Sequence, residues 1–253
     1  MLEVKNLSGG YGQKTVLREV SFSAPDGQIT AILGPNGCGK STLLKMICGV
    51  LPAASGSVSL NGQDLRKLPS NRIAQKVAYL AQCRQIPDIT VGRLVLHGRF
   101  PYLSYPRRYR QEDYRVAKEV MERLQILDLA DTLLSRLSGG QQQKAYIAMA
   151  LAQDTDVILL DEPTTYLDVS HQLQLLRQAK DLAKMGKHVL VVIHDLSHGL
   201  ESADRVVLMD GGNAVIEGTP EEVYQSGTLE RVLGVKVSRV RLDDEWHYLC
   251  TEK

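Results

Sequence analysis

The sequence has 253 residues, which fits one large domain or two small ones and is enough to bury a hydrophobic core. Its hydrophobic share of 43% and its charged share of 23% place it among globular proteins. The net charge of +1 excludes any argument from overall charge for nucleic acid or an acidic surface as a partner.

Two strands are expected at the N-terminal end. Apolar and polar side chains alternate over residues 2–7, which predicts a half-buried strand, and residues 16–22 predict a second one. Between them the glycine-rich stretch 8–12 is expected to form a loop that exposes Tyr11. On spacing alone, two interpretations of Tyr11 are equally good: its ring stacks on adenine, or it covers the loop.

The next motif predicts a phosphate-binding loop. It matches Gly-x-x-x-x-Gly-Lys-Ser/Thr at every fixed position, between an apolar strand at 29–33 and a helix from 42 to 47. Glycines let backbone N–H groups close around phosphate oxygens, and the helix N-terminus adds unsatisfied donors. Lys40 is expected to reach the β- and γ-phosphates, and Ser41 to ligate Mg²⁺. The loop consists of Gly34, Pro35, Asn36, Gly37, Cys38, Gly39, Lys40, Ser41 and Thr42.

Further strands follow this loop. Residues 57–60 predict a short strand with a hairpin turn at 61–62, and the apolar run 77–81 predicts a strand that ends at Gln82. The amide of Gln82 has two possible roles. Strand ends in α/β sheets carry ligand-facing residues, but such an amide can equally face solvent.

Residues 89–153 change to helical periodicity, which predicts a helical subdomain inserted into the sheet topology. Within it, residues 101–110 are rich in tyrosine and arginine and fit a solvated loop better than a contact site for RNA or protein. In Leu-Ser-Gly-Gly-Gln at 137–141, Ser138 is an N-cap candidate, followed by two glycines that leave backbone donors uncovered. This helix N-terminus is a second potential anion site.

Two adjacent acids end the next buried strand. The apolar run 157–160 leads to Asp161 and Glu162, which alternation directs to different sides of the strand end. One of them can hold Mg²⁺ through its water shell while the other addresses an attacking water. In a chain with a phosphate loop, such a pair is poorly explained as surface charge.

The following segments complete the expected sheet. A loop at 163–168 and a helix at 169–184 lead to a buried strand at 187–193, which ends at His194. Four strands of βα type with a helical insertion predict a mostly parallel sheet.

The C-terminal part carries weaker signals. Residues 206–216 predict a hairpin and residues 221–233 short helices, whereas the strand-like tail 235–250 has no assigned role. The chain shows no signal-peptide pattern and no run of 18 apolar residues, so it is not expected to span a membrane. The cysteines lack metal-ligand spacing and indicate a reducing compartment; they are Cys38, Cys48, Cys83 and Cys250.

Together these residues resemble the ATP-binding subunit of an ABC transporter over residues 2–234, with 235–253 as a C-terminal tail. The resemblance implies an α/β fold, a P-loop NTPase of ABC type. Its sheet is mostly parallel, with an antiparallel β subdomain and a helical subdomain inserted at about 89–153. The family's motifs follow in order: Walker A at 34–42, Gln82 of the Q-loop, the signature at 137–141, Walker B at 157–162, the D-loop at 165–168 and the switch His194.

The resemblance also implies roles for individual residues. Glu162 is implied as the general base, with Gln82 and His194 as further catalytic residues. Mg²⁺ is implied to be held by Ser41, Gln82 and Asp161. Besides the phosphate loop, the implied ATP contacts are Tyr11, Ser138, Gly139, Gly140, Gln141 and Asp168.

The family works in assemblies, which implies partners for this chain. Two copies would pair head to tail, so that the phosphate loop of one and residues 138–141 of the other enclose one MgATP. Hydrolysis would reopen this dimer and move integral membrane permease subunits, placing the chain at the cytoplasmic face of the cell membrane. An extracytoplasmic substrate-binding protein is an indirect partner, and no nucleic acid is expected.

A narrower resemblance concerns the transported solute. Residues 90–99, 147–153 and 164–172 are similar to importers of the iron-siderophore, haem and cobalamin type, although molybdate-type importers share much of this pattern. One departure is Gln-Gln-Lys at 142–144, where the family often has Arg-Gln-Arg, which weakens the expectation of nucleotide-linked contacts there. The alternatives are an export ATPase and a soluble ABC ATPase acting on ribosomes or DNA, although the single set of motifs disfavours the latter.

Overall fold

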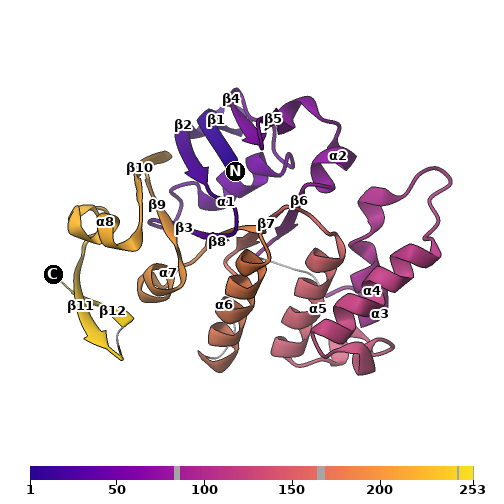
Figure 1. The fold of residues 1–253 in the computed structure, drawn as a ribbon. Coiled ribbons are helices and arrows are strands. Elements are labelled where there is room, and N and C mark those ends of the chain that lie inside the picture. Colours follow the sequence, from indigo (N-terminus) through magenta and orange to yellow (C-terminus); the bar gives the residue numbers. More distant parts are fainter. Residues whose placement is uncertain (83–85, 164–168, 244, 253) are drawn as a thin grey trace.

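Two β-sheets, helices on their flanks and a C-terminal hairpin make up the fold (Figure 1). It is seen in a computed structural model that describes residues 1–82, 86–163, 169–243 and 245–252. The hairpin lies at the opposite end of the molecule from the helices drawn in magenta (Figure 1).

The first sheet is antiparallel, with the strand order β2-β1-β4-β5. Its strands are β1 (Leu2–Tyr11), β2 (Lys14–Ala24), β4 (Ser55–Leu60) and β5 (Gln63–Asp64). The prediction of a loop at residues 8–12 is wrong, because β1 continues through the glycines and pairs Tyr11 with Lys14. A Cβ atom at Gly10 would lie 1.9 Å from the Lys14 carbonyl oxygen, so glycine is what allows the two backbones to approach here.

The second sheet is mostly parallel, as predicted, with the order β10-β9-β3-β8-β7-β6. Its strands are β3 (Ile29–Leu33), β6 (Val77–Leu80), β7 (Val157–Asp161), β8 (His188–Val192), β9 (Arg205–Asp210) and β10 (Asn213–Gly218). The predicted hairpin is formed by β9 and β10, but β9 also pairs with β3 in parallel. The described residues therefore contain five parallel strands, one more than the four predicted, because both edges of β9 are occupied.

The helices flank these sheets (Figure 1). They are α1 (Lys40–Ile47), α2 (Ser70–Ala74), α3 (Val91–His97), α4 (Gln111–Arg123), α5 (Gly139–Ala152), α6 (Val169–Lys184), α7 (Leu196–Ser202), α8 (Pro220–Gln225) and α9 (Thr228–Leu233). Single 3₁₀ turns are η1 (Leu65–Lys67), η2 (Phe100–Tyr102), η3 (Leu127–Leu129) and η4 (Leu134–Arg136). Of the helices in the described ranges, none is both long enough and apolar enough to cross a membrane.

The parallel sheet has an apolar core on each face. Ile32 and Leu159 belong to the core shared with α1 and the antiparallel sheet. Ala31 and Ile158, their neighbours along β3 and β7, belong to the core shared with α3, α5, α6 and α7. Because alternate side chains enter different cores, these central strands are apolar at successive positions.

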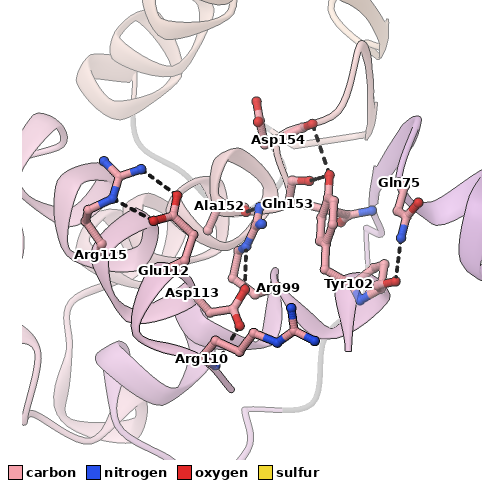
Figure 2. A network of polar contacts seen from close by, with 11 residues as sticks. Gln75, Arg99, Tyr102, Arg110, Glu112, Asp113, Arg115, Ala152, Gln153 and Asp154 are labelled. Atoms are coloured by element: carbon pink, nitrogen blue, oxygen red, sulfur yellow. Dashed lines mark hydrogen bonds and ion pairs between the residues drawn. The ribbon is translucent and has the colours of Figure 1, made fainter. Parts of the chain in front are cut away.

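Between β6 and β7 the described elements are helical, as the periodicity predicts, and α3, α4 and α5 pack on one another. A buried polar network joins them (Figure 2). Arg99 Nε donates to Asp113 Oδ1 at 3.2 Å and its Nη1 donates to the Ala152 carbonyl oxygen at 2.9 Å. Tyr102, predicted as part of a solvated linker, instead donates its hydroxyl to the Gln153 carbonyl oxygen at 2.9 Å, because the end of α5 leaves carbonyl groups unpaired.

The strand-like C-terminal tail forms a hairpin of β11 (Val235–Leu242) and β12 (Glu245–Glu252). Tyr248 is buried and meets Tyr224 of α8 edge to face, with ring centroids 5.7 Å apart. Its backbone N–H donates to Glu201 Oε1 on α7 at 3.1 Å. These contacts fasten the hairpin to α7 and α8.

Candidate functional site

The predicted phosphate loop connects β3 to α1 and exposes its tip at Asn36 and Gly37. Gly34 has φ of 145°, and a Cβ atom there would lie 2.2 Å from the Met209 carbonyl oxygen on β9. Gly39 has φ of 109°, and a Cβ atom there would lie 2.6 Å from a side chain of β2. The loop is thus packed so closely between two strands that these positions require glycine.

Lys40 is the first residue of α1 and is 6% exposed. Its Nζ donates to the carbonyl oxygens of Gly34 at 2.7 Å and Pro35 at 3.0 Å, so the ammonium group turns back over the loop. A phosphate oxygen is a stronger partner for this charge than a neutral carbonyl. Cys38 and Thr42 are buried as well, and burial raises the pKa of the Cys38 thiol.

Ser41 and Asp161 meet below the loop. The Ser41 hydroxyl donates to Asp161 Oδ1 at 2.9 Å, which joins the first turn of α1 to the end of β7. Tyr79 of β6 donates to Asp161 Oδ2 at 2.8 Å. The pKa of Tyr79 is raised, mainly by burial and secondly by this hydrogen bond to Asp161, so its hydroxyl stays a donor. The sequence reasoning missed Tyr79; its one signal is a hydroxyl group within an otherwise apolar strand.

Gln82, Glu162 and His194 converge, although they follow three different strands. Gln82 Nε2 donates to Glu162 Oε2, and His194 Nε2 lies 2.5 Å from Glu162 Oε1. Glu162 is 8% exposed and has φ of 47°, a left-handed conformation that turns the chain sharply after β7. The carboxyl ends of parallel strands share one edge of the sheet, which explains the convergence. The described structure thus places the Gln82 amide on Glu162.

Tyr11 ends β1 with its side chain 47% exposed. The Lys45 ammonium of α1 lies 3.5 Å from its hydroxyl and 5.9 Å from its ring centroid. The ring therefore stands beside the helix that follows the phosphate loop, with a free area on which a planar group can stack.

The second predicted anion site is the N-terminus of α5. Ser138 caps it as expected, because its Oγ accepts from the Gln141 N–H at 3.3 Å while the Gln141 side chain accepts from the Ser138 N–H at 3.0 Å. Ser138, Gly139 and Gln141 are exposed, whereas Gly140 is buried. A Cβ atom at Gly140 would lie 2.2 Å from the imidazole of His171 on α6, a contact that the sequence reasoning also missed.

The loop predicted at 165–168, with Asp168 as an ATP contact, lies outside the described residues. At the departure from the family pattern, Gln142 Nε2 donates to the carbonyl oxygens of Leu134 and Leu137 at 3.1 and 3.2 Å. This glutamine therefore holds η4 against the start of α5.

The donor set fits a magnesium ion. Mg²⁺ prefers hard oxygen ligands and keeps several of its waters. The Ser41 hydroxyl and the Asp161 carboxylate supply such oxygens 2.9 Å apart, at the end of a strand beside the phosphate loop. The Gln82 amide, on the adjacent strand end, is the third predicted ligand.

The chain is similar in sequence to known proteins. Residues 17–165 match the family described as "ABC transporter". The chain is 40% identical over 237 residues to the ferric enterobactin transport ATP-binding protein FepC of Escherichia coli (strain K12), covering 93% of this chain and 88% of FepC. It is 37% identical over 259 residues to the hemin import ATP-binding protein HmuV of Pseudomonas aeruginosa (strain PAO1), covering 100% of both chains.

Solved structures agree with these sequence relatives. One, described as an inward-facing conformation of a metal-chelate type ABC transporter, superposes with a TM-score of 0.84 at 28% identity and covers 99% of this chain and 96% of its own. A nucleotide-free ATP-binding cassette from an ABC transporter superposes with a TM-score of 0.83 at 26% identity, covering 92% of this chain and 97% of its own.

Proposed function

Since the chain belongs to the ABC transporter family, whose ATP-binding subunits hydrolyse ATP, we propose that it powers uptake of a metal chelate through a membrane permease. The proposed solutes are an iron-siderophore, haem or cobalamin. Support comes from relatives whose names specify ferric enterobactin, iron(3+)-hydroxamate and hemin.

The observation that carries the hydrolytic function is that Gln82 and His194 both contact the carboxylate of Glu162. Glu162 directly follows Asp161, which accepts a hydrogen bond from Ser41 of the phosphate-loop helix. A base, a metal-binding acid and a phosphate-binding loop therefore share one edge of the sheet, which is the arrangement that phosphoryl transfer to water requires.

The residues have distinct roles in this proposal. Lys40 exchanges its two carbonyl partners for oxygens of the β- and γ-phosphates and neutralises their charge. Ser41, Asp161 and Gln82 would hold Mg²⁺, which would offset the charge that develops on the phosphates. Glu162 orients a water molecule and accepts its proton as the water oxygen bonds to the γ-phosphorus. The bond from this phosphorus to the oxygen shared with the β-phosphate breaks, so that ADP and phosphate are the products.

His194 has two partners in turn. In this structure its Nε2 contacts Glu162, and during hydrolysis the imidazole contacts the γ-phosphate. Each oxygen of Glu162 has one partner in this structure and keeps a second lone pair, with which it can accept a hydrogen bond from the attacking water.

We propose that the complete site forms between two copies of the chain. The exposed N-terminus of α5 offers the Ser138 hydroxyl and the Gly139 backbone N–H to a nucleotide held by the loop of a second copy, while the N–H groups of Ser138 and Gln141 are bonded within the helix cap. Asp168 and Tyr11 complete the proposed contacts, Tyr11 through its exposed ring. ATP thus joins the two copies, and hydrolysis separates them.

The proposed partners are integral membrane permease subunits, which place the chain at the cytoplasmic face of the cell membrane. An extracytoplasmic binding protein supplies the solute to the permease. Within this assembly the opening and closing of the two copies drives the permease.

Uptake by the parent cell tests the proposal. Deletion of this subunit is expected to abolish uptake of one labelled solute among a ferric siderophore, haem and cobalamin. The wild-type chain is expected to restore uptake, and Glu162→Gln is expected not to.

Normal uptake of all three, with loss of another solute or of export, would reject the proposed solute class and leave the ATPase intact. Co-purification separates the remaining alternatives. A polytopic membrane protein recovered with the chain supports a transporter, whereas ribosomes or DNA in its place would favour a soluble ABC ATPase.

A further inference from the structure

The carboxylate of Asp161 is held between hydroxyl groups from two distant parts of the chain. Ser41 donates to Oδ1 at 2.9 Å and Tyr79 donates to Oδ2 at 2.8 Å. We propose that Tyr79 is a positioning residue for the magnesium ion: it fixes the Asp161 carboxylate with Oδ1 toward Ser41. The inference rests on the magnesium site of the proposed function.

The strand register explains how a side chain of β6 reaches the end of β7. Parallel pairing sets Tyr79 opposite Leu159, two residues before Asp161. The ring packs against the apolar core that the sheet shares with α1, so it lies on the same face as the helix that carries Ser41. The length of the phenol then brings its hydroxyl to the strand end.

Because Asp161 is buried, losing the hydrogen bond from Tyr79 would disturb its carboxylate. Asp161 is 2% exposed, so its oxygens have almost no access to water. Without the phenol, Oδ2 would remain without its donor, or the carboxylate would rotate to find another. Rotation would move Oδ1 away from the Ser41 hydroxyl. Only while these two oxygens stay side by side would both contact the ion or its waters.

The adjacent acid, Glu162, has different hydrogen-bond partners from Asp161. Gln82 and His194 contact the oxygens of Glu162, whereas Ser41 and Tyr79 donate to those of Asp161. Loss of the Tyr79 hydroxyl therefore bears on the acid that holds the metal and leaves the partners of the proposed base in place. The expected effect is on metal affinity.

The test uses Tyr79→Phe, which keeps the ring and removes only the hydroxyl. Calorimetric titration with AMP-PNP, a non-hydrolysable ATP analogue, gives its dissociation constant without metal and with Mn²⁺. The ratio of the two constants is the metal-dependent gain in affinity. Tyr79→Phe is expected to lower this gain about tenfold, the lower end of what loss of an outer hydrogen-bond partner of a metal ligand costs. The metal-free constant is expected to change less than twofold.

Two further variants serve as the negative and the positive control. Tyr102→Phe removes a phenol that donates to the Gln153 carbonyl oxygen in the helical segment, and it is expected to keep the full gain. Asp161→Asn removes the carboxylate itself and is expected to lose most of the gain. Circular dichroism and the electron paramagnetic resonance spectrum of bound Mn²⁺ show whether the fold and the metal surroundings of Tyr79→Phe are altered.

A wild-type gain in Tyr79→Phe would overturn the inference. Equal weakening of AMP-PNP binding with and without Mn²⁺ would also overturn it, because the phenol would then support the loop and not the metal. If the wild-type chain itself showed no gain, the proposed magnesium site would fail together with the inference. Normal uptake of all three solutes after deletion of the subunit would reject only the solute class, so the two failures are distinguishable.

Discussion

The imidazole of His194 contacts the carboxylate of Glu162 across the ends of β8 and β7, with Nε2 2.5 Å from Oε1. Glu162 meets it from a left-handed backbone conformation with φ of 47°, which is uncommon for a residue with a Cβ atom. Such conformations persist where the surroundings over-determine them, often at functional sites. The contact therefore supports the proposal that Glu162 is the base in hydrolysis.

Glu162→Gln is expected to slow hydrolysis by about 10²- to 10⁴-fold, the usual contribution of a general base. Binding of MgATP should be retained, because Ser41 and Asp161 keep their contact. The variant should therefore accumulate as an ATP-dependent dimer. Phosphate release measures the first effect and light scattering with and without ATP the second; turnover at the wild-type rate would exclude the role as base.

Lys40→Ala is expected to abolish tight binding of MgATP, because it removes the ammonium group that the loop holds over its own carbonyl oxygens. Titration with fluorescent ATP measures the loss. Lys67→Ala is the matched control, since that lysine side chain is 84% exposed on η1. An unchanged dissociation constant for Lys40→Ala would contradict the phosphate-loop assignment.

Gly140→Ala is expected to destabilise the fold by about 1–3 kcal/mol, the usual cost of overpacking, because its Cβ atom would lie 2.2 Å from the His171 imidazole. Gly139→Ala is the control, since nothing lies within 4 Å of a Cβ atom there. Combining Gly140→Ala with His171→Ala should recover much of the loss. Urea denaturation measures the coupling, and strictly additive effects would show that the two residues do not interact.

Arg99→Ala is expected to cost about 3–5 kcal/mol, because it leaves the buried carboxylate of Asp113 without its cation and the Ala152 carbonyl oxygen without its donor (Figure 2). Arg99→Lys should recover only part, since an ammonium group cannot reproduce the forked guanidinium contacts. Arg115→Ala removes ion pairs on the exposed surface of α4 and serves as the control, with little expected change. Equal midpoints of thermal unfolding for Arg99→Ala and Arg115→Ala would contradict the structural role of the network.

The sequence alone determined the features that depend on neighbouring residues. The phosphate loop at 34–42 follows from glycine spacing between an apolar strand and a helix, and the cap at Ser138 from its place directly before a run with helical periodicity. The convergence of Glu162 and His194 was also predictable in kind, because parallel strands place their carboxyl ends at one edge. Local chemistry and a single topological rule are sufficient for these.

Only the tertiary structure decided the contacts that depend on register and packing. Tyr79 reaches Asp161 because β6 lies beside β7, and Gly140 meets His171 because α5 packs near α6. No periodicity in the chain encodes which strand is adjacent to which, or which helix faces cross. These contacts join residues far apart in the sequence. Which residues meet is decided by the apolar cores, because they set the order of the strands in the sheet and the way the helices pack.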